Sequence, residues 1–275
     1  MTELSKRIAV SIIGIIVFIS AAHYGFLPFF FFMGLVIISA LYEFYGLFDK
    51  MDFKPLKWLG MVLAFFLLLL FFLDTASISF SNDLGIFTNI LLVLLVIMPF
   101  FFFLFKKDIA NSVISIAITV FGVFYVGWCL GHFIVLRSIQ PFGRIYVYYI
   151  LVVVWLIDII AYFVGRKFGT RKILPSISPK KSVIGSTAGF ISAVLTSLMF
   201  KVFFIKSMSI KHSLILGIII GIFAQAGDFS ESLIKRNAGK KDSGTLLPGH
   251  GGVLDRFDSF IFVAPIVYYY IKIII

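Results

Sequence analysis

Nine apolar stretches, each long enough to cross a lipid bilayer, are the feature that most limits how this chain can fold. A helix needs about 20 apolar residues to cross the hydrocarbon layer, where the backbone must satisfy its own hydrogen bonds. The sequence therefore predicts an all-α, polytopic integral membrane protein with about nine transmembrane helices. The expected spans are residues 8–24, 27–48, 56–73, 84–105, 109–136, 145–165, 186–205, 212–232 and 257–275.

The composition excludes the soluble classes of protein. Only 13% of the residues are charged and 61% are hydrophobic, whereas about a quarter of an ordinary soluble domain is charged. A soluble protein of this length could not cover so much apolar surface with so few polar side chains. A soluble enzyme, a disordered chain, a collagen and a disulfide scaffold are therefore excluded.

Nine spans would place the termini on opposite sides of the membrane, and the basic residues divide unevenly between those sides. Segments on the side of the N-terminus hold 18 Lys and Arg residues, and segments on the other side hold six. Because basic loops tend to stay in the cytoplasm, the N-terminus is expected to be cytoplasmic and the C-terminus outside.

Two polar segments, 165–185 and 233–256, are longer than the other loops and are rich in charge, Gly and Pro. Both fall on the predicted cytoplasmic side, and loops of this kind commonly carry function. We therefore divide the chain into N-terminal transmembrane helices, 1–137, and a C-terminal catalytic region, 138–275. The active site is expected to face the cytoplasm.

Carboxylates stand out because so few charges occur in this chain. Asp228 ends the eighth expected span, and Asp255 and Asp258 open the ninth and share a helix face. If these spans pack as a hairpin, Asp228 and Asp255 approach each other and repel unless a cation or a proton intervenes. Their oxygen atoms suit Mg²⁺. Alternatively, each acid pairs with a nearby base such as Arg256.

A further carboxylate, Asp158, lies inside the sixth span. Intramembrane acids are costly and usually face a cavity or a partner. Asp158 is therefore either part of a polar site or one half of an ion pair.

The segment 232–258 combines cations with glycines. Cations, glycines and metal-binding acids together suit a di- or triphosphate. A second cationic strip, Ser178-Pro179-Lys180-Lys181, is made rigid by its proline. The alternative for that strip is a role in orientation and in contact with anionic lipid headgroups. The residues of 232–258 that carry this prediction are the cations and glycines Lys235, Arg236, Lys241, Gly249, Gly251 and Gly252, together with His250.

The run from Ser232 to Asp258 resembles the signature of the phosphatidate cytidylyltransferases, also called CDP-diacylglycerol synthases. The matching elements are S-x-I-K-R, K-D-S-G, L-P-G-H-G-G and V-x-D-R-F-D. The resemblance extends upstream to the run from Asp158 to Arg166 and to Ser-Pro-Lys-Lys at 178–181. One departure is Ile184, which stands where the family often has an acid.

The resemblance implies Mg²⁺-dependent transfer of CMP from CTP to phosphatidic acid in phospholipid biosynthesis, which gives CDP-diacylglycerol and pyrophosphate. It also implies a helical fold with a cytoplasm-facing polar cavity that lipid enters sideways, and a homodimer in the prokaryotic inner or plasma membrane. CTP, phosphatidic acid and membrane lipids are the expected partners, with no nucleic acid. A second, monovalent cation such as K⁺ is a further expectation.

The resemblance and the residue chemistry together suggest a site. Mg²⁺ on Asp228 and Asp255 would neutralise phosphate charge, and Asp258 would orient Arg256 or a metal-bound water. The expected catalytic residues are Asp228, Asp255, Asp258, Lys241 and Arg256. The expected substrate-binding residues are Lys180, Lys181, Ser178, Lys235, Arg236, Asp242, His250, Gly251, Gly252 and Asp158. Which basic segment binds the lipid phosphate and which binds CTP stays open.

Other functions remain as alternatives. One is a CTP-dependent transferase or kinase that acts on another lipid, such as an ether lipid or a prenol. A different class is a transporter or channel with Asp158 and Asp228 in the conduction path. The gathering of polar residues on one side, and the absence of a visible inverted repeat in the sequence, argue against that class.

Overall fold

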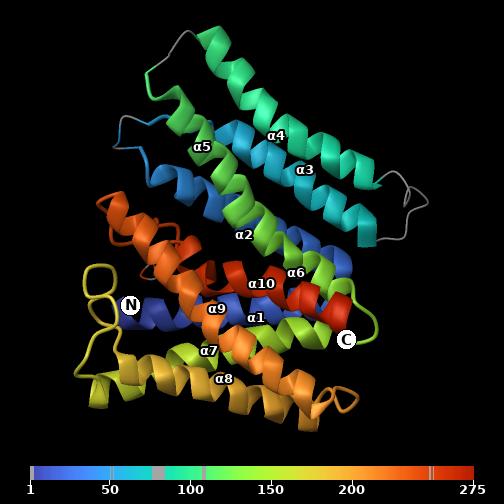
Figure 1. The fold of residues 1–275 in the computed structure, drawn as a ribbon, viewed down its shortest axis with the longest axis vertical. Coiled ribbons are helices and arrows are strands. Elements are labelled where there is room, and N and C mark those ends of the chain that lie inside the picture. The colour runs from blue at the N-terminus through green and yellow to red at the C-terminus, as the bar shows by residue number, and fades with distance from the viewer. Residues whose placement is uncertain are drawn as a thin grey trace. The chain divides into compact units, whose positions relative to one another are not determined.

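The computed structural model describes residues 3–49, 51, 53–75, 84–106, 110–247, 249 and 251–275, and these fold into helices joined by loops (Figure 1). The helices are α1 Glu3–Tyr24, α2 Phe26–Gly46, α3 Lys57–Thr75, α4 Leu84–Lys106, α5 Ser112–Gly122, α6 Cys129–Ser138, α7 Gly143–Phe168, α8 Val183–Phe203, α9 Ile210–Asn237 and α10 Leu254–Ile274. A π-helical stretch, Val123–Trp128, joins α5 to α6 without a break.

Eight helical stretches among the described residues are long and apolar enough to cross a membrane. The continuous stretch Ser112–Ser138 is one of them, and α1 adds a shorter apolar portion, Val10–Tyr24. The predicted spans therefore correspond in order to the observed helices. The prediction of an all-α, polytopic membrane protein is confirmed.

The helix ends differ from the prediction near the polar segments. Helix α9 continues to Asn237, beyond the predicted end at 232, and α10 begins at Leu254 rather than 257. The reason is that hydropathy marks the apolar part of a helix, whereas the backbone hydrogen bonds continue into the polar flank. Asp228 is consequently inside α9 and not at its end, which corrects the expected position.

The chain divides into two compact units. One consists of Met1–Ser138 with Ala238–Arg256, and the other consists of Ile139–Asn237 with Phe257–Ile275. The loop between α9 and α10 thus belongs to the unit of the N-terminal helices. The functional division into 1–137 and 138–275 stays a prediction.

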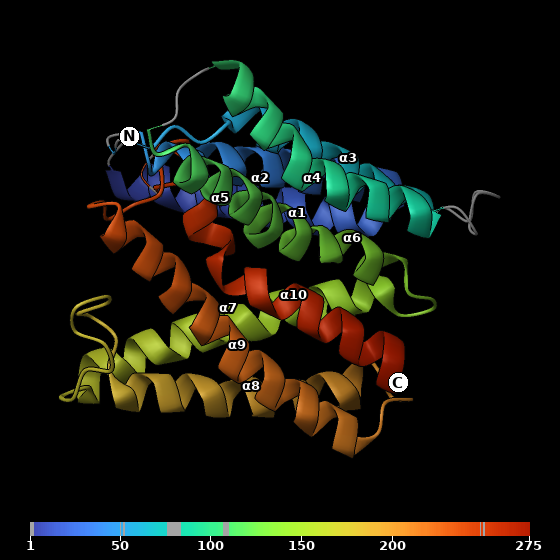
Figure 2. The same cartoon turned by 45° about the horizontal axis from the view of Figure 1, so that its top comes forward.

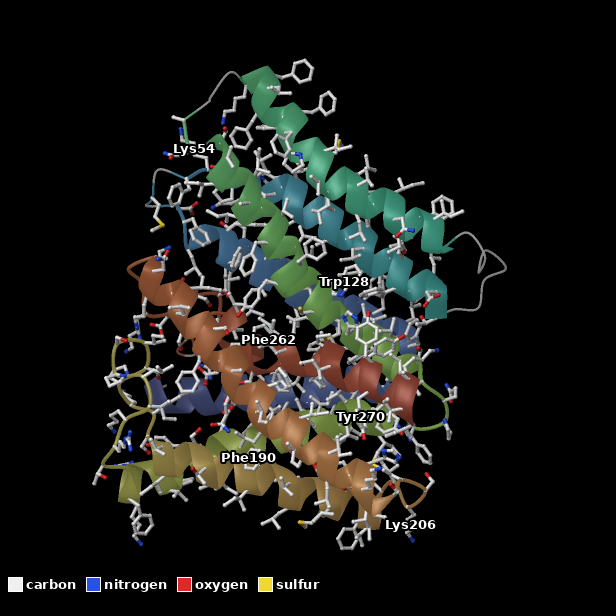
Figure 3. The ribbon with its side chains drawn as sticks, in the orientation of Figure 1. Lys54, Trp128, Phe190, Lys206, Phe262 and Tyr270 are labelled. Carbon is white, nitrogen blue, oxygen red and sulfur yellow. The ribbon has the colours of Figure 1, made fainter. Side chains whose placement is uncertain are left out.

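In the first unit, helix α2 packs against α1, α3, α5 and α6. Near its C-terminal end the ring of Tyr45 is completely buried, and its hydroxyl donates to the Thr119 carbonyl at 2.8 Å. Gly60 and Gly122 make room for this ring. Further along, Trp128 (Figure 3) contacts Phe71 edge to face, with ring centroids 5.7 Å apart. Aromatic packing therefore holds these helices together.

In the second unit α8 packs against both α7 and α9 (Figure 2). Helices α8 and α9 approach closely at the glycines of α9, because a Cβ atom at Gly217 would lie 2.8 Å from Cα of Val194. One turn later, a Cβ at Gly221 would lie 2.8 Å from the ring of Phe190, which is labelled in Figure 3. Small residues thus bring the helices close enough to share a polar pocket.

Candidate active site

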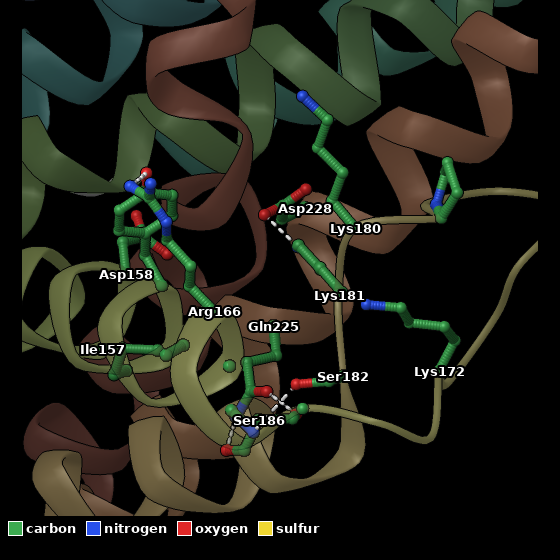
Figure 4. A pocket seen from close by; sticks show the side chains of 16 residues that line it. Ile157, Asp158, Arg166, Lys172, Lys180, Lys181, Ser182, Ser186, Gln225 and Asp228 are labelled. Atoms are coloured by element: carbon green, nitrogen blue, oxygen red, sulfur yellow. Dashed lines mark hydrogen bonds and ion pairs between the residues drawn. The ribbon is translucent and has the colours of Figure 1, made fainter.

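A cavity of about 570 Å³ opens in the second unit, beside α7, α8, α9 and the loop 169–182 (Figure 4). Its volume is in the range of small-ligand pockets. The charged side chains that line it are Asp158, Arg166, Lys172, Lys180, Lys181 and Asp228. Four of these six are cationic, so the cavity suits an anionic ligand.

The loop 169–182 folds back on itself and so brings its lysines to one cavity. The amide of Ile173 donates to the carbonyl of Lys181 at 3.3 Å, and the amide of Val183 donates to the carbonyl of Arg171 at 3.0 Å. Ser182 then caps α8, since its hydroxyl accepts from the Gly185 amide at 3.2 Å. Lys172 and Lys181 line the same wall as a result.

Lys181 forms an ion pair with Asp228, drawn as a dashed line in Figure 4. The Lys181 ammonium also lies 4.5 Å from the centroid of the Phe229 ring, which is a favourable position for a cation. The Ser232 hydroxyl donates to Asp228 over a long 3.4 Å. Two predicted site residues from separate segments are therefore brought together.

An uncharged polar pair completes the cavity wall. The Ser186 hydroxyl donates to the Gln225 side-chain oxygen, and the Gln225 amide group donates to the Gly221 carbonyl at 2.8 Å. Sequence reasoning did not identify Ser186, Gln225, Arg166 or Lys172 as site residues. The signal for Gln225 was present, because it is an amide inside an otherwise apolar span.

Other acids gather near Asp228. Asp258, in the second turn of α10, lies within electrostatic range of Asp228, Glu231 and Asp158. Glu231 is completely buried and forms an ion pair with Lys235, one turn further along α9. Lys235 is thus a mostly buried partner of an acid, and its predicted contact with substrate stays a prediction.

Arg236 and Ser178 shape the same region. Arg236 is exposed, and its Nε donates to the Ile177 carbonyl at 3.1 Å, which ties the end of α9 to the loop. The amide of Ser178 donates to the Leu174 carbonyl at 2.9 Å inside that loop. Ile184, at the position where an acid is often expected, is exposed and is not part of the cavity wall.

The loop 238–253 of the first unit surrounds Asp255. The Asp255 carboxylate accepts from the Gly252 amide at 2.8 Å and from the Ser243 amide at 3.0 Å. Because Asp255 lies in the first turn of α10, the helix dipole also favours its negative charge. The loop therefore holds this carboxylate in a defined orientation.

Two glycines of this loop have a backbone conformation that other residues rarely adopt. Gly249 and Gly251 have φ values of 76° and 83°, in the left-handed region that favours glycine. Gly252 allows a close approach to its neighbours instead. Lys241, Asp242 and Arg256 are exposed, and the predicted residue His250 lies outside the described residues.

The predicted metal ligands Asp228 and Asp255 belong to different units, so their pairing stays a prediction. Among the described residues, no group of three or more His, Cys, Asp and Glu side chains is arranged to hold a metal ion. The prediction needs only two carboxylates, because Mg²⁺ usually takes one or two carboxylates and completes its shell with phosphates and water.

Comparison with known proteins agrees with the resemblance seen in the signature. The sequence model of the Cytidylyltransferase family matches residues 5–274. A phosphatidate cytidylyltransferase of Bacillus subtilis (strain 168) is 33% identical over 270 residues, which cover 98% of each chain. Another from Staphylococcus saprophyticus is 35% identical over 265 residues, or 94% of this chain and 96% of that protein. The chain therefore belongs to the cytidylyltransferase family along nearly its whole length.

Proposed function

We propose that this protein is a phosphatidate cytidylyltransferase, which transfers CMP from CTP to phosphatidic acid and produces CDP-diacylglycerol and pyrophosphate. The observation that carries the proposal is the similarity, along nearly the full chain, to relatives with that name. The cationic cavity of α7, α8 and α9 supports it, because both substrates are phosphate anions.

The reaction requires positive charge and correct positioning of the substrates, and it does not require a strong base. The nucleophile is a phosphate monoester oxygen of the lipid, which is already anionic near neutral pH because the second pKa of such a phosphate is about 6. The difficulty is to bring two polyanions together. Arg166, Lys172, Lys180 and Lys181 would supply positive charge at the cavity wall, and in-line attack would depend on positioning and electrostatic stabilisation.

Lys181 would change partners during the reaction. In the structure its ammonium is paired with Asp228. A substrate phosphate that enters the cavity would compete for that ammonium, and charge-assisted bonds to phosphate are strong. The released Asp228 carboxylate would then be available for a cation.

Mg²⁺ is part of the proposal, with Asp228 and Asp255 as its protein ligands. Both carboxylates are oriented by neighbours, Asp228 by Lys181 and Ser232, and Asp255 by the amides of Ser243 and Gly252. Oriented carboxylate oxygens fit a hard divalent cation. The bound ion would supply positive charge to the phosphoryl oxygens and to the leaving pyrophosphate. A second, monovalent cation such as K⁺ is proposed on the family resemblance alone.

The orientation in the membrane is also a proposal. The excess of Lys and Arg on one predicted side supports a cytoplasmic N-terminus and active site. The homodimer and the sideways entry of lipid are supported by the family resemblance alone.

Product analysis of the purified protein in detergent tests the function. With CTP, phosphatidic acid and Mg²⁺, we expect equal amounts of pyrophosphate and CDP-diacylglycerol. Release of CDP instead of pyrophosphate would indicate a CTP-dependent kinase acting on a lipid alcohol. No turnover by folded protein, together with solute flux into liposomes without CTP, would indicate a transporter.

A further inference from the structure

Glu43 is a carboxylate of α2 whose partners all lie more than 190 residues later in the chain. Its side chain is only 4% exposed. Its Oε2 accepts a hydrogen bond from the Leu254 amide at 2.9 Å and one from the Ser243 hydroxyl at 3.2 Å. Both donors belong to the loop 238–253 or to the first residue of α10. A buried acid in a membrane protein is costly, so this arrangement points to a defined role.

The loop is shaped closely around this carboxylate. A Cβ atom at Gly244 would overlap one carboxylate oxygen of Glu43, and a Cβ atom at Gly252 would overlap the other. Two glycines of the signature motif are therefore required by contact with a residue of α2. Gly244 and Gly252 of the signature therefore pack directly against the Glu43 carboxylate.

A second contact ties the loop to the same helix end. The Lys240 ammonium donates to the Gly46 carbonyl at 2.6 Å, and Gly46 is the last residue of α2. A cation at a helix C-terminus is favoured by the carbonyl groups and by the helix dipole. The end of α2 thus holds the loop at both Lys240 and Ser243.

Ser243 links Glu43 to Asp255. Its hydroxyl donates to Glu43, while its backbone amide donates to the Asp255 carboxylate at 3.0 Å. Leu254, whose amide donates to Glu43, is the residue directly before Asp255. Movement of the Glu43 carboxylate would therefore displace Ser243, which donates to the Asp255 carboxylate, and Leu254, the residue before Asp255.

We propose that Glu43 is a positioning residue for the transfer reaction, which holds the signature loop so that Asp255 is presented at a fixed angle. The inference depends on the proposed function, in which Asp255 is a metal ligand. Glu43 acts through Ser243 and Leu254. Loss of a group that orients a metal ligand typically lowers metal affinity or activity by about 10–100-fold.

Three variants separate positioning from simple support of the fold. Glu43→Ala removes both hydrogen bonds, and Glu43→Gln retains a carbonyl oxygen that can accept them. Tyr45→Phe is the matched control, since it removes another buried hydrogen bond of the same helix end, to Thr119 rather than to the loop.

Hydrogen–deuterium exchange of the residues 240–256 in detergent measures the loop directly. In Glu43→Ala we expect exchange there to be about tenfold faster or more, because hydrogen bonds to a charged group are lost. Exchange in α7, α8 and α9 should stay unchanged. Tyr45→Phe should leave exchange of the loop at the wild-type rate.

Metal binding and turnover then decide whether the loop matters for the site. We expect Glu43→Ala to weaken Mn²⁺ binding, measured by electron paramagnetic resonance, and to lower kcat by about 10–100-fold. Glu43→Gln should recover most of both. A loop that exchanges at the wild-type rate in Glu43→Ala, or a loosened loop with wild-type Mn²⁺ affinity, would overturn the proposal.

Two further outcomes are a Glu43→Ala variant that does not fold and a wild-type protein that does not turn over. If Glu43→Ala does not accumulate as folded protein, Glu43→Asp, which shortens the side chain by one carbon, gives the same comparison. If the wild-type protein binds Mn²⁺ but does not turn over CTP and phosphatidic acid, the proposed function fails. The exchange and Mn²⁺ measurements then still decide whether Glu43 positions Asp255.

Discussion

Lys181, in the loop before α8, forms an ion pair with Asp228, which lies inside α9 and 47 residues later in the chain. Both side chains are mostly shielded, with 32% and 21% of their surfaces exposed. The pair places one negative and one positive side chain at the wall of a cavity that suits phosphate. Substitution of Lys181 tests whether this pair belongs to the substrate site.

Lys181→Met should lower kcat/KM for CTP and phosphatidic acid by about 10–100-fold, because a charge-assisted hydrogen bond to phosphate is lost. Steady-state pyrophosphate release measures the effect. Lys167→Met is the control, since Lys167 is an exposed lysine of α7 that does not line the cavity. Equal activity of the two variants would remove Lys181 from the site.

Asp255→Asn should abolish turnover while the fold remains intact. The asparagine can still accept hydrogen bonds from Ser243 and Gly252 through its side-chain oxygen, but it loses the charge that a divalent cation requires. Product formation and thermal unfolding in detergent are the two measurements. Asp74→Asn, at an exposed acid near the end of α3, is the control. Activity close to wild type in Asp255→Asn would contradict the metal assignment.

Gly251→Ala and Gly239→Ala form a matched pair. Both glycines have positive φ, 83° and 65°, so alanine should cost each variant about 1–2 kcal/mol of stability. Only at Gly251 would the new Cβ atom meet a site residue, at 2.9 Å from Oδ2 of Asp255, whereas nothing lies within 4 Å at Gly239. We expect similar losses in thermal stability and a loss of turnover in Gly251→Ala alone. Equal turnover of Gly251→Ala and Gly239→Ala would show that the reaction tolerates a displaced Asp255.

Gly217→Ala should destabilise the second unit by about 1–3 kcal/mol, because the added Cβ atom would lie 2.8 Å from the backbone of α8. The control is Gly34→Ala in α2, where nothing lies within 4 Å. Thermal unfolding of both variants in detergent gives the comparison. A melting temperature of Gly217→Ala equal to that of the control would mean that α8 and α9 can separate at little cost.

Removal of divalent metal by a chelator should stop turnover, and added Mg²⁺ should restore it. The reason is that the proposed reaction brings two polyanions together and needs positive charge on the phosphoryl oxygens. Pyrophosphate release before and after chelation is the measurement. Full turnover in the chelated protein would show that the three lysines and one arginine of the cavity supply enough positive charge.

The spans could be predicted from the sequence because the bilayer imposes one requirement on every helix. About 20 apolar residues must occur in a row, and the backbone must bond to itself. The signature between Ser232 and Asp258 likewise identified the family, which the comparisons confirm. The ends of α9 and α10 were less predictable, since a helix continues beyond its apolar part.

The partners of the charged side chains were decided only by the tertiary structure. Sequence did not indicate that Lys181 pairs with Asp228, that Lys235 pairs with Glu231, or that Glu43 holds a loop some 200 residues away. The physical reason is that lipid and protein interior are similarly apolar, so hydropathy marks which residues are in the membrane but not which helices pack together. In the second unit, close approach at Gly217 and Gly221 brings α9 against α8 and so places the side chains of α9 beside the loop that carries Lys181.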